Sequence, residues 1–135
     1  MFIISITKDE KKQLIKIGYK VIESENLPVP SNIKILSPFA GIRTRNGTCI
    51  LQKRNNSYKI IIYSRVADYE NDPKGKFIND KTGIKCRRLA VGKDRSLNEI
   101  KETLAHEIAH LKFWDHGAQH KSYTNHILNK IEELC

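Results

Sequence analysis

Cysteines and long apolar runs are both scarce in this sequence. Its 135 residues include three cysteines, Cys49, Cys86 and Cys135, with no metal-type spacing between them. An odd number of scattered cysteines argues against a disulfide framework and suits a reducing compartment. No apolar stretch approaches the roughly 20 residues of a membrane span, and the apolar start at Phe2–Ile6 is too short for a signal-peptide core. We therefore expect an intracellular protein, cytoplasmic or nuclear, without a membrane partner.

Acidic residues are too few to balance the basic ones. The sequence has 24 lysines and arginines against 15 aspartates and glutamates, a formal net charge of +9. A field of this sign attracts polyanions, so DNA or RNA is the expected partner. Arg87, Arg88, Lys93 and Arg95 precede the histidine segment described below and are the candidate nucleic-acid contacts. The competing interpretation is a solvated basic surface without a partner, because lysine-rich composition can reflect the base composition of a genome.

Internal repeats, low-complexity tracts and Gly/Ser-rich linkers are also absent, so residues 1–135 are expected to form one domain. Apolar periodicity predicts an N-terminal helix from Thr7 or Asp9 to about Asn26, and a capping box at Ser96 and Glu99 opens a second helix. Other patterns predict strands at 33–36, 48–53, 58–66 and 84–91, an exposed loop at 68–82, and a last helix at 118–134. The expected fold class is α+β, with an N-terminal helix, a small mixed β-sheet and two closing helices.

Two histidines and a glutamate in the second predicted helix carry the chemistry. They are His106, Glu107 and His110, in the pattern HExxH. Residues four apart lie on one face of an α-helix, so both imidazoles can reach a common ion, with Glu107 beside it. A catalytic zinc site keeps three protein ligands and a water, which a nearby carboxylate can deprotonate. The spacing therefore predicts a zinc (Zn2+) site with Glu107 as its base, against the alternative of a solvated helix face.

A zinc site needs a third ligand, and His116 is the first choice because Gly117 eases a turn that would bring it back under the ion. All five histidines fall in the last third of the chain, which favours a metal. Asp115 has two further interpretations, as an acceptor for the free ring N–H of a ligand histidine or as an ordinary turn residue. The rival third ligands are His120, His126, Asp115, Glu132 and Glu133.

The motif resembles a known group of enzymes. The spacing from His106 to His116 is that of the metzincins, but Phe113 stands where that family has glycine, and Met1 is the sole methionine, which excludes a Met-turn. Together with Gly83–Leu89 and Glu99–Leu104, the motif instead resembles the small intracellular zincins of the WLM, SprT-like and YgjP-like families, WLM most closely. The resemblance covers the C-terminal part of the chain and implies a zincin-like minimal metallopeptidase domain.

WLM and SprT-like members are proteases that trim proteins crosslinked to DNA, so the resemblance implies a substrate of that kind. It also implies that a sheet strand beside the histidine helix holds the substrate backbone by strand addition. Residues 84–91 are the segment expected to do so, with an interior strand as the alternative.

We therefore predict a zinc metallopeptidase in which Glu107 takes a proton from a water at the metal and returns it to the leaving amine. Tyr123 or His120 is a candidate donor to the oxyanion. The expected substrate is a protein associated with DNA or crosslinked to it. Two alternatives stay open: a zinc peptidase with a non-DNA substrate, and a non-catalytic zinc-stabilised binding module closed by a fourth ligand such as His120. Oligomeric state is left open.

Overall fold

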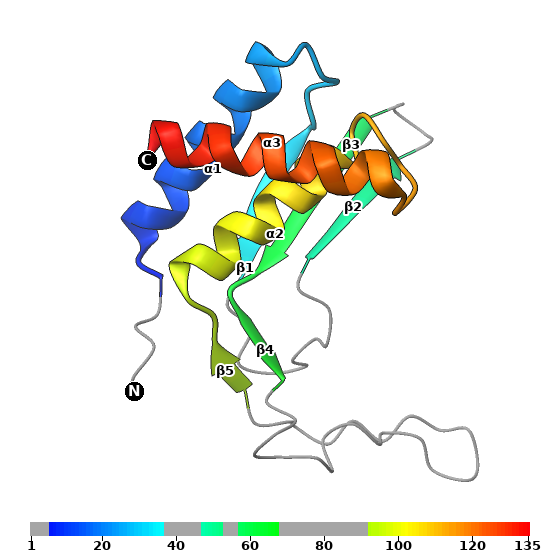
Figure 1. The fold of residues 1–135 in the computed structure, drawn as a ribbon. Coiled ribbons are helices and arrows are strands. Elements are labelled where there is room, and N and C mark those ends of the chain that lie inside the picture. The colour runs from blue at the N-terminus through cyan, green and yellow to red at the C-terminus, as the bar shows by residue number, and fades with distance from the viewer. Residues whose placement is uncertain (1–5, 37–46, 53–56, 68–91) are drawn as a thin grey trace, which may run out of the picture.

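The fold is α+β, as the sequence predicts. The computed structural model describes residues 6–36, 47–52, 57–67 and 92–135, which form three helices and five strands. Two helices, α1 (Lys8–Ser24) and α2 (Leu97–Ala109), pack on one face of the main sheet, and α3 (Ala118–Leu134) lies across α2 and contacts α1 (Figure 1). Helix α2 is therefore held between the sheet and α3.

The main sheet is small and mixed, also as expected. Its strands are β1 (Asn32–Leu36), β2 (Gly47–Gln52) and β3 (Ser57–Tyr63), in the order β1-β3-β2. The pairing of β1 with β3 is parallel, and that of β2 with β3 is antiparallel. Both outer strands thus have one neighbour among the described residues, and β2 is the outer strand that contacts α2.

The strand predicted at 58–66 is wrong in one respect, because it is interrupted at Ser64. The buried Ser64 donates its N–H to the carbonyl of Leu36, while its own carbonyl accepts from the N–H of Arg95. The chain then leaves the main sheet and continues as β4 (Arg65–Ala67), which pairs with β5 (Gly92–Asp94). The strand predicted at 84–91 and the loop predicted at 68–82 lie outside the described residues.

Capping boxes start the first two helices. Thr7, rather than Asp9, caps α1 through its hydroxyl, and Glu10 returns the contact to the N–H of Thr7. Ser96 and Glu99 do the same for α2, as the sequence predicts. Each box satisfies two backbone N–H groups that have no partner within the helix.

The core joins all three helices to the sheet. Apolar side chains of α2 face the sheet at one-turn intervals, and Ile100, Leu104 and Ile108 have no exposed area. Ile60 and Ile62 of β3 are likewise fully buried against them. Burial of such a side chain is worth about 1.5–3 kcal/mol, so this packing fixes where α2 carries its polar residues.

No helix in the described parts of the chain is long and apolar enough to cross a membrane.

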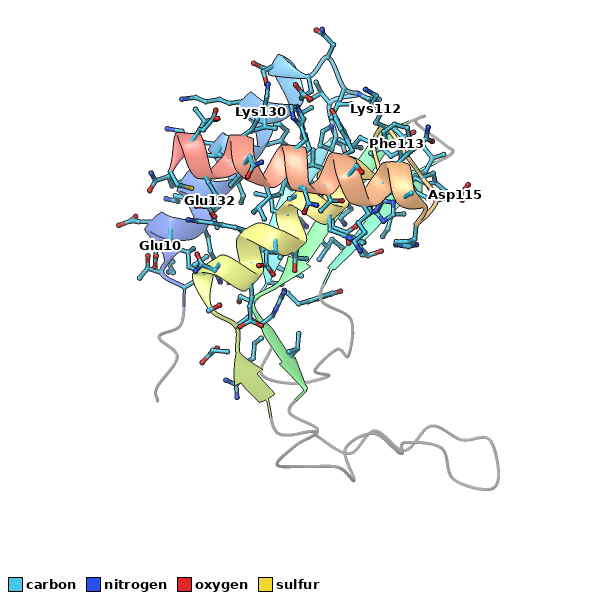
Figure 2. The ribbon with its side chains drawn as sticks, in the orientation of Figure 1. Glu10, Lys112, Phe113, Asp115, Lys130 and Glu132 are labelled. Atoms are coloured by element: carbon cyan, nitrogen blue, oxygen red, sulfur yellow. The ribbon has the colours of Figure 1, made fainter. Side chains whose placement is uncertain are left out.

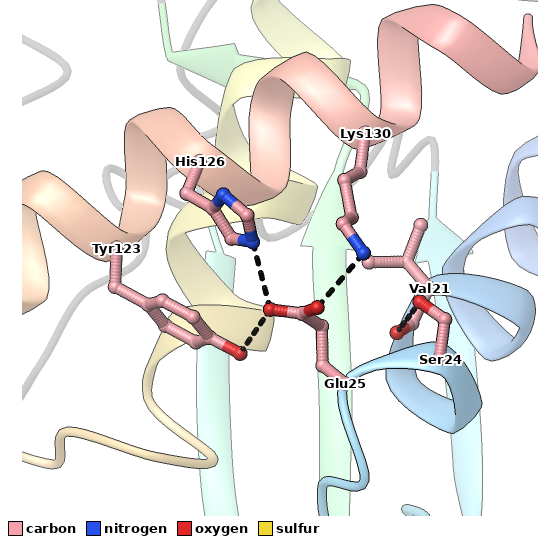
Figure 3. Close-up of polar contacts among 6 residues, drawn as sticks. All are labelled: Val21, Ser24, Glu25, Tyr123, His126 and Lys130. Carbon is pink, nitrogen blue, oxygen red and sulfur yellow. Dashed lines mark hydrogen bonds and ion pairs between the residues drawn. The ribbon is translucent and has the colours of Figure 1, made fainter.

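A carboxylate at the end of α1 anchors α3. Glu25 receives hydrogen bonds from the hydroxyl of Tyr123 and from Nε2 of His126, each at 2.9 Å, and pairs with Nζ of Lys130 at 2.8 Å (Figure 3). The contact with Lys130 is the main cause that lowers the pKa of Glu25 to about 2, against the opposing effect of burial. The C-cap residue of α1 thus holds three residues along one side of α3.

This anchor predicts a pH-dependent stability. The pKa of Glu25 is lower in the folded than in the unfolded state. The stabilisation of the folded state by the Glu25 carboxylate is therefore fully present above about pH 4.5 and is lost as the pH falls toward 2. Glu25→Gln should cost about 2 kcal/mol of unfolding free energy at pH 7 and progressively less below pH 4.5. Urea unfolding with chelator present, from pH 3 to 7, measures this. Glu23→Gln, at an exposed position of the same helix, is the matched control, and an equal loss at every pH would contradict the anchor.

Candidate metal centre

The end of α2 brings the three residues of the HExxH motif together. His106 and Glu107 lie in the last turn of the helix, and His110 is its C-cap, still in helical conformation with φ −64° and ψ −20°. His110 and Glu107 are buried, with 8% and 5% of their areas exposed. The helical geometry therefore extends through the whole motif, as the four-residue spacing requires.

Three imidazole nitrogens converge here. Nε2 of His110 lies 3.2 Å from Nε2 of His106 and 3.1 Å from Nε2 of His116. Nδ1 of His110 lies 3.2 Å from the carbonyl oxygen of Phe113, to which it can donate. With its proton on Nδ1, His110 turns the Nε2 lone pair toward the other two rings. The chain from Phe113 to His116 therefore brings the ring of His116 back to the end of α2.

A fourth histidine lies under these rings. His120 is 3% exposed, and its ring stacks on that of His110 at 4.1 Å between centroids. Its Nε2 lies 3.0 Å from the backbone carbonyl oxygen of His106, so it can donate a hydrogen bond there. His106, His110 and His120 each offer one ring nitrogen within 4.8 Å of the others, close enough to hold a metal ion.

Burial keeps the central histidines neutral. It lowers the pKa of His106 to about 4, helped by the neighbouring His120, His110 and His116, and it also lowers the pKa of His110. An imidazole must be neutral to offer a lone pair to a metal. Both rings are thus in the ligand form at pH 7.

Glu107 lies between α2 and the edge strand β2. A Cβ atom on Gly47 of β2 would be 3.4 Å from Cγ of Glu107, so the backbone of β2 lies close to the Glu107 side chain at this point. Burial raises the pKa of Glu107 to about 7. Burial and the charge of Glu107 together raise the pKa of the nearby Cys49 thiol to about 12, which keeps the thiol protonated. Glu107 can therefore accept and release a proton near neutral pH.

Solvent reaches the cluster from two sides of His106. One depression, of about 390 Å³, lies on the α3 side, and its lining includes His106, His116, His120 and Thr124. The other, of about 360 Å³, lies on the β2 side and is lined by Gly47, Arg95, Glu102, Thr103, His106 and Glu107. A ligand could thus approach both the histidines and Glu107.

Of the rival third ligands, His120 lies in the cluster, whereas the other four lie elsewhere or are exposed. His126 contacts Glu25 instead, and Glu132, at the opposite end of α3 from Asp115, pairs with Lys101 at 3.5 Å (Figure 2). Glu133 is exposed near the end of α3. Asp115 is also exposed, and Nδ1 of His110 faces the carbonyl of Phe113 rather than this carboxylate. A backbone acceptor leaves no signal in a sequence, so this partner could not be predicted.

The prediction that Tyr123 donates to an oxyanion is corrected. Its hydroxyl donates to Glu25, and burial together with this carboxylate raises the pKa of Tyr123. Tyr123 precedes Thr124 and Asn125, which line the depression at the histidines, but it does not line that depression itself. The hydroxyl therefore belongs to the α1 contact.

The prediction for Arg95 as a nucleic-acid contact is corrected as well. Arg95 is 6% exposed, and its guanidinium donates to the carbonyls of Tyr63 and Glu99 and to the hydroxyl of Thr103. Arg95 thus joins the end of β3 to α2. Arg87 and Arg88 lie outside the described residues, as does the side chain of Lys93.

Gly47 is a site residue that the sequence interpretation missed, since Asn46-Gly47 is typical of a turn. A Cβ atom at Gly47 would lie 2.8 Å from Cγ2 of Thr103 and 3.0 Å from the carbonyl oxygen of Ile61. Gly47→Ser should therefore push β2 away from α2 and cost about 1–3 kcal/mol of stability. Gly117→Ser is the control, because a Cβ there meets nothing within 4 Å and serine is a good N-cap. Thermal unfolding of both variants measures the difference, and equal melting temperatures would argue against the close approach.

Comparison of the chain with models of protein families, with curated proteins and with solved structures finds no match. What the histidine cluster does must follow from its own geometry and chemistry.

Proposed function

We propose that this protein is a zinc metallopeptidase with a zincin-like fold, which hydrolyses peptide bonds in proteins associated with DNA or crosslinked to it. The observation that carries the proposal is that Nε2 of His110 lies within 3.2 Å of Nε2 of His106 and of His116, while the buried Glu107 lines one depression together with His106. The sequence resemblance to WLM and SprT-like zincins supports the same activity.

The donor set suits zinc. With zinc-to-nitrogen distances of about 2.0–2.1 Å, two ligands of a tetrahedral zinc are about 3.3 Å apart. The spacings of 3.2 and 3.1 Å around Nε2 of His110 are close to that value. We assign His106, His110 and His116 as the ligands. His120 is assigned to orient the site, because its Nε2 is directed at the His106 carbonyl.

Glu107 is the proposed general base. A zinc ion held by the three histidines would lower the pKa of a water molecule and polarise a peptide carbonyl. Glu107 would take the proton of the attacking water and deliver it to the leaving amine. Its low exposure strengthens electrostatic interactions at the site, and its pKa near 7 suits a group that must both accept and give a proton.

The edge strand β2 is the proposed support for the substrate backbone. It runs beside α2, and its residue Gly47 lines the same depression as Glu107. Among the described residues it is hydrogen-bonded to β3 alone, and we propose that the N–H and C=O groups of its other edge pair with an added strand. In this proposal β2 holds the substrate backbone by strand addition, a role that the sequence analysis expected of residues 84–91.

The positive charge supports nucleic acid as a partner. Beyond the net charge of +9, four lysines of α1 recur every four residues and are all exposed: Lys8, Lys12, Lys16 and Lys20. Such a row lies along one helix face at intervals of about 6 Å. Contacts of this kind would make DNA binding weaken steeply with salt.

The test is Glu107→Gln. This variant should keep one zinc per chain by elemental analysis and lose at least about 100-fold of the rate at which the protein cleaves a basic, loosely folded protein. Cleavage by the unchanged protein should rise with single-stranded DNA. Glu133→Gln, an exposed carboxylate near the end of α3, is the matched control and should cleave normally. Undiminished cleavage by Glu107→Gln would remove the general base, and DNA-independent cleavage would favour a peptidase with another substrate.

A closed zinc module is the second candidate, favoured by the position of His120 within reach of His106 and His110. The two functions differ in what the histidine variants do. For the peptidase, His116→Ala should weaken zinc binding more than His120→Ala, whose loss should be about 10–100-fold as for an orienting residue. Chelator competition measures both. Equal losses, with four nitrogen ligands and no exchangeable water in the zinc-edge absorption spectrum, would select the closed module.

A further inference from the structure

The single tryptophan of the chain lies beside the histidines. Trp114, in the connection between α2 and α3, is 51% exposed. Its ring centroid is 6.0 Å from that of His110 and 6.1 Å from that of Tyr58 in β3. An indole that could be buried in the core is thus kept half open to solvent next to a proposed metal ligand.

An exposed leucine of the edge strand extends this apolar surface. Leu51 of β2 is 37% exposed and is paired directly with Tyr58 in the ladder. Side chains alternate along a strand, so Leu51 is on the same face as Gly47 and Cys49, which face α2. Tyr58 and Cys49 both pack against the core on that face. Trp114, Tyr58 and Leu51 together are called the apolar ledge below.

The apolar ledge is aligned with the proposed path of the substrate. Gly47, at one end of β2, lines the depression with Glu107, and Leu51 follows four residues later along the same strand. At about 3.3 Å per residue, the ledge is two to four residue positions away from the reacting carbonyl along an added strand. A side chain opposite Leu51 would point to the face on which Tyr58 and Trp114 lie.

We propose that the apolar ledge is a specificity subsite, which takes a large apolar side chain of an extended peptide added antiparallel to β2. This inference rests on the proposed function and names its substrate class. The antiparallel direction puts the recognised residue on the amino-terminal side of the scissile bond, two to four positions before it. A side chain bound on the ledge removes apolar surface of Trp114 and Leu51 from water. Peptides with a large apolar residue at this position should therefore be preferred about tenfold or more over peptides with a small polar residue there.

Trp114 gives a readout that does not depend on catalysis. In zinc-loaded Glu107→Gln protein, peptide binding should shift the fluorescence of this one indole to shorter wavelength. Peptides carrying phenylalanine two, three or four positions before a fixed central bond are compared with the same peptides carrying serine. We expect about tenfold tighter binding for phenylalanine at one of these positions.

Two neighbouring residues provide the matched variants. Leu51→Ser should remove most of the preference for phenylalanine, whereas Ile50→Ser, at a 42% exposed position on the opposite face of β2, should keep it. In the protein with Glu107 intact, the same preference should appear as the ratio of the kcat/KM values for the phenylalanine and serine peptides. Trp114→Ala should reduce that ratio. A purely structural role for Trp114 would change the melting temperature but leave the ratio unchanged.

The outcomes separate this inference from the proposed function. Cleavage without any preference at the three positions, or equal effects of Leu51→Ser and Ile50→Ser, would overturn the subsite and leave the peptidase standing. A fluorescence preference for phenylalanine without cleavage of any peptide by the zinc-loaded protein would support the subsite as a peptide-binding surface and overturn the peptidase.

Discussion

The packing of α2 between the sheet and α3 is the constraint on which the candidate site depends. Ile100, Leu104 and Ile108 are fully buried toward the sheet, so the rotation of the helix about its axis is fixed by core packing. That rotation presents Glu107 to β2 and His106 to α3. A rotation of the helix would move Glu107 away from β2 and would move His106 and His110 away from His116 and His120, so the core and the site are set by the same contacts.

Local patterns account for what the sequence predicted well. The capping box at Ser96 and Glu99, the final helix at 118–134 and the four-residue spacing of His106 and His110 involve contacts between residues close in the chain, and these were predicted. Thr7 was one of two candidates for the start of α1, and its capping box with Glu10 was not predicted. The break at Ser64 was not predicted either, because it depends on hydrogen bonds to Leu36 and Arg95, which are distant in sequence. The roles of Tyr123 and Arg95 were misjudged for the same reason, since their partners come from other elements. The zinc ligand set and the peptidase activity stay predictions.

Two residues that shape the site carry no chemical signal of their own. Gly47 matters because it has no side chain where β2 meets α2, and Phe113 matters through its backbone carbonyl. Residue type reveals donors, acceptors and charges, whereas these contributions come from an absent atom and from the main chain. Predicting them needs the spatial relation of α2 to β2 and to the α2–α3 connection.

The Glu25 contacts and the histidine cluster both involve helix α3. His120 is on the same helix as Tyr123, His126 and Lys130, which bind Glu25. Because α1 already holds that helix in place, metal binding does not have to supply the free energy for ordering it. The affinity of these histidines for a metal ion would therefore be thermodynamically linked to a carboxylate that does not belong to the cluster, and α1 would preorganise a site built from the end of α2 and the start of α3.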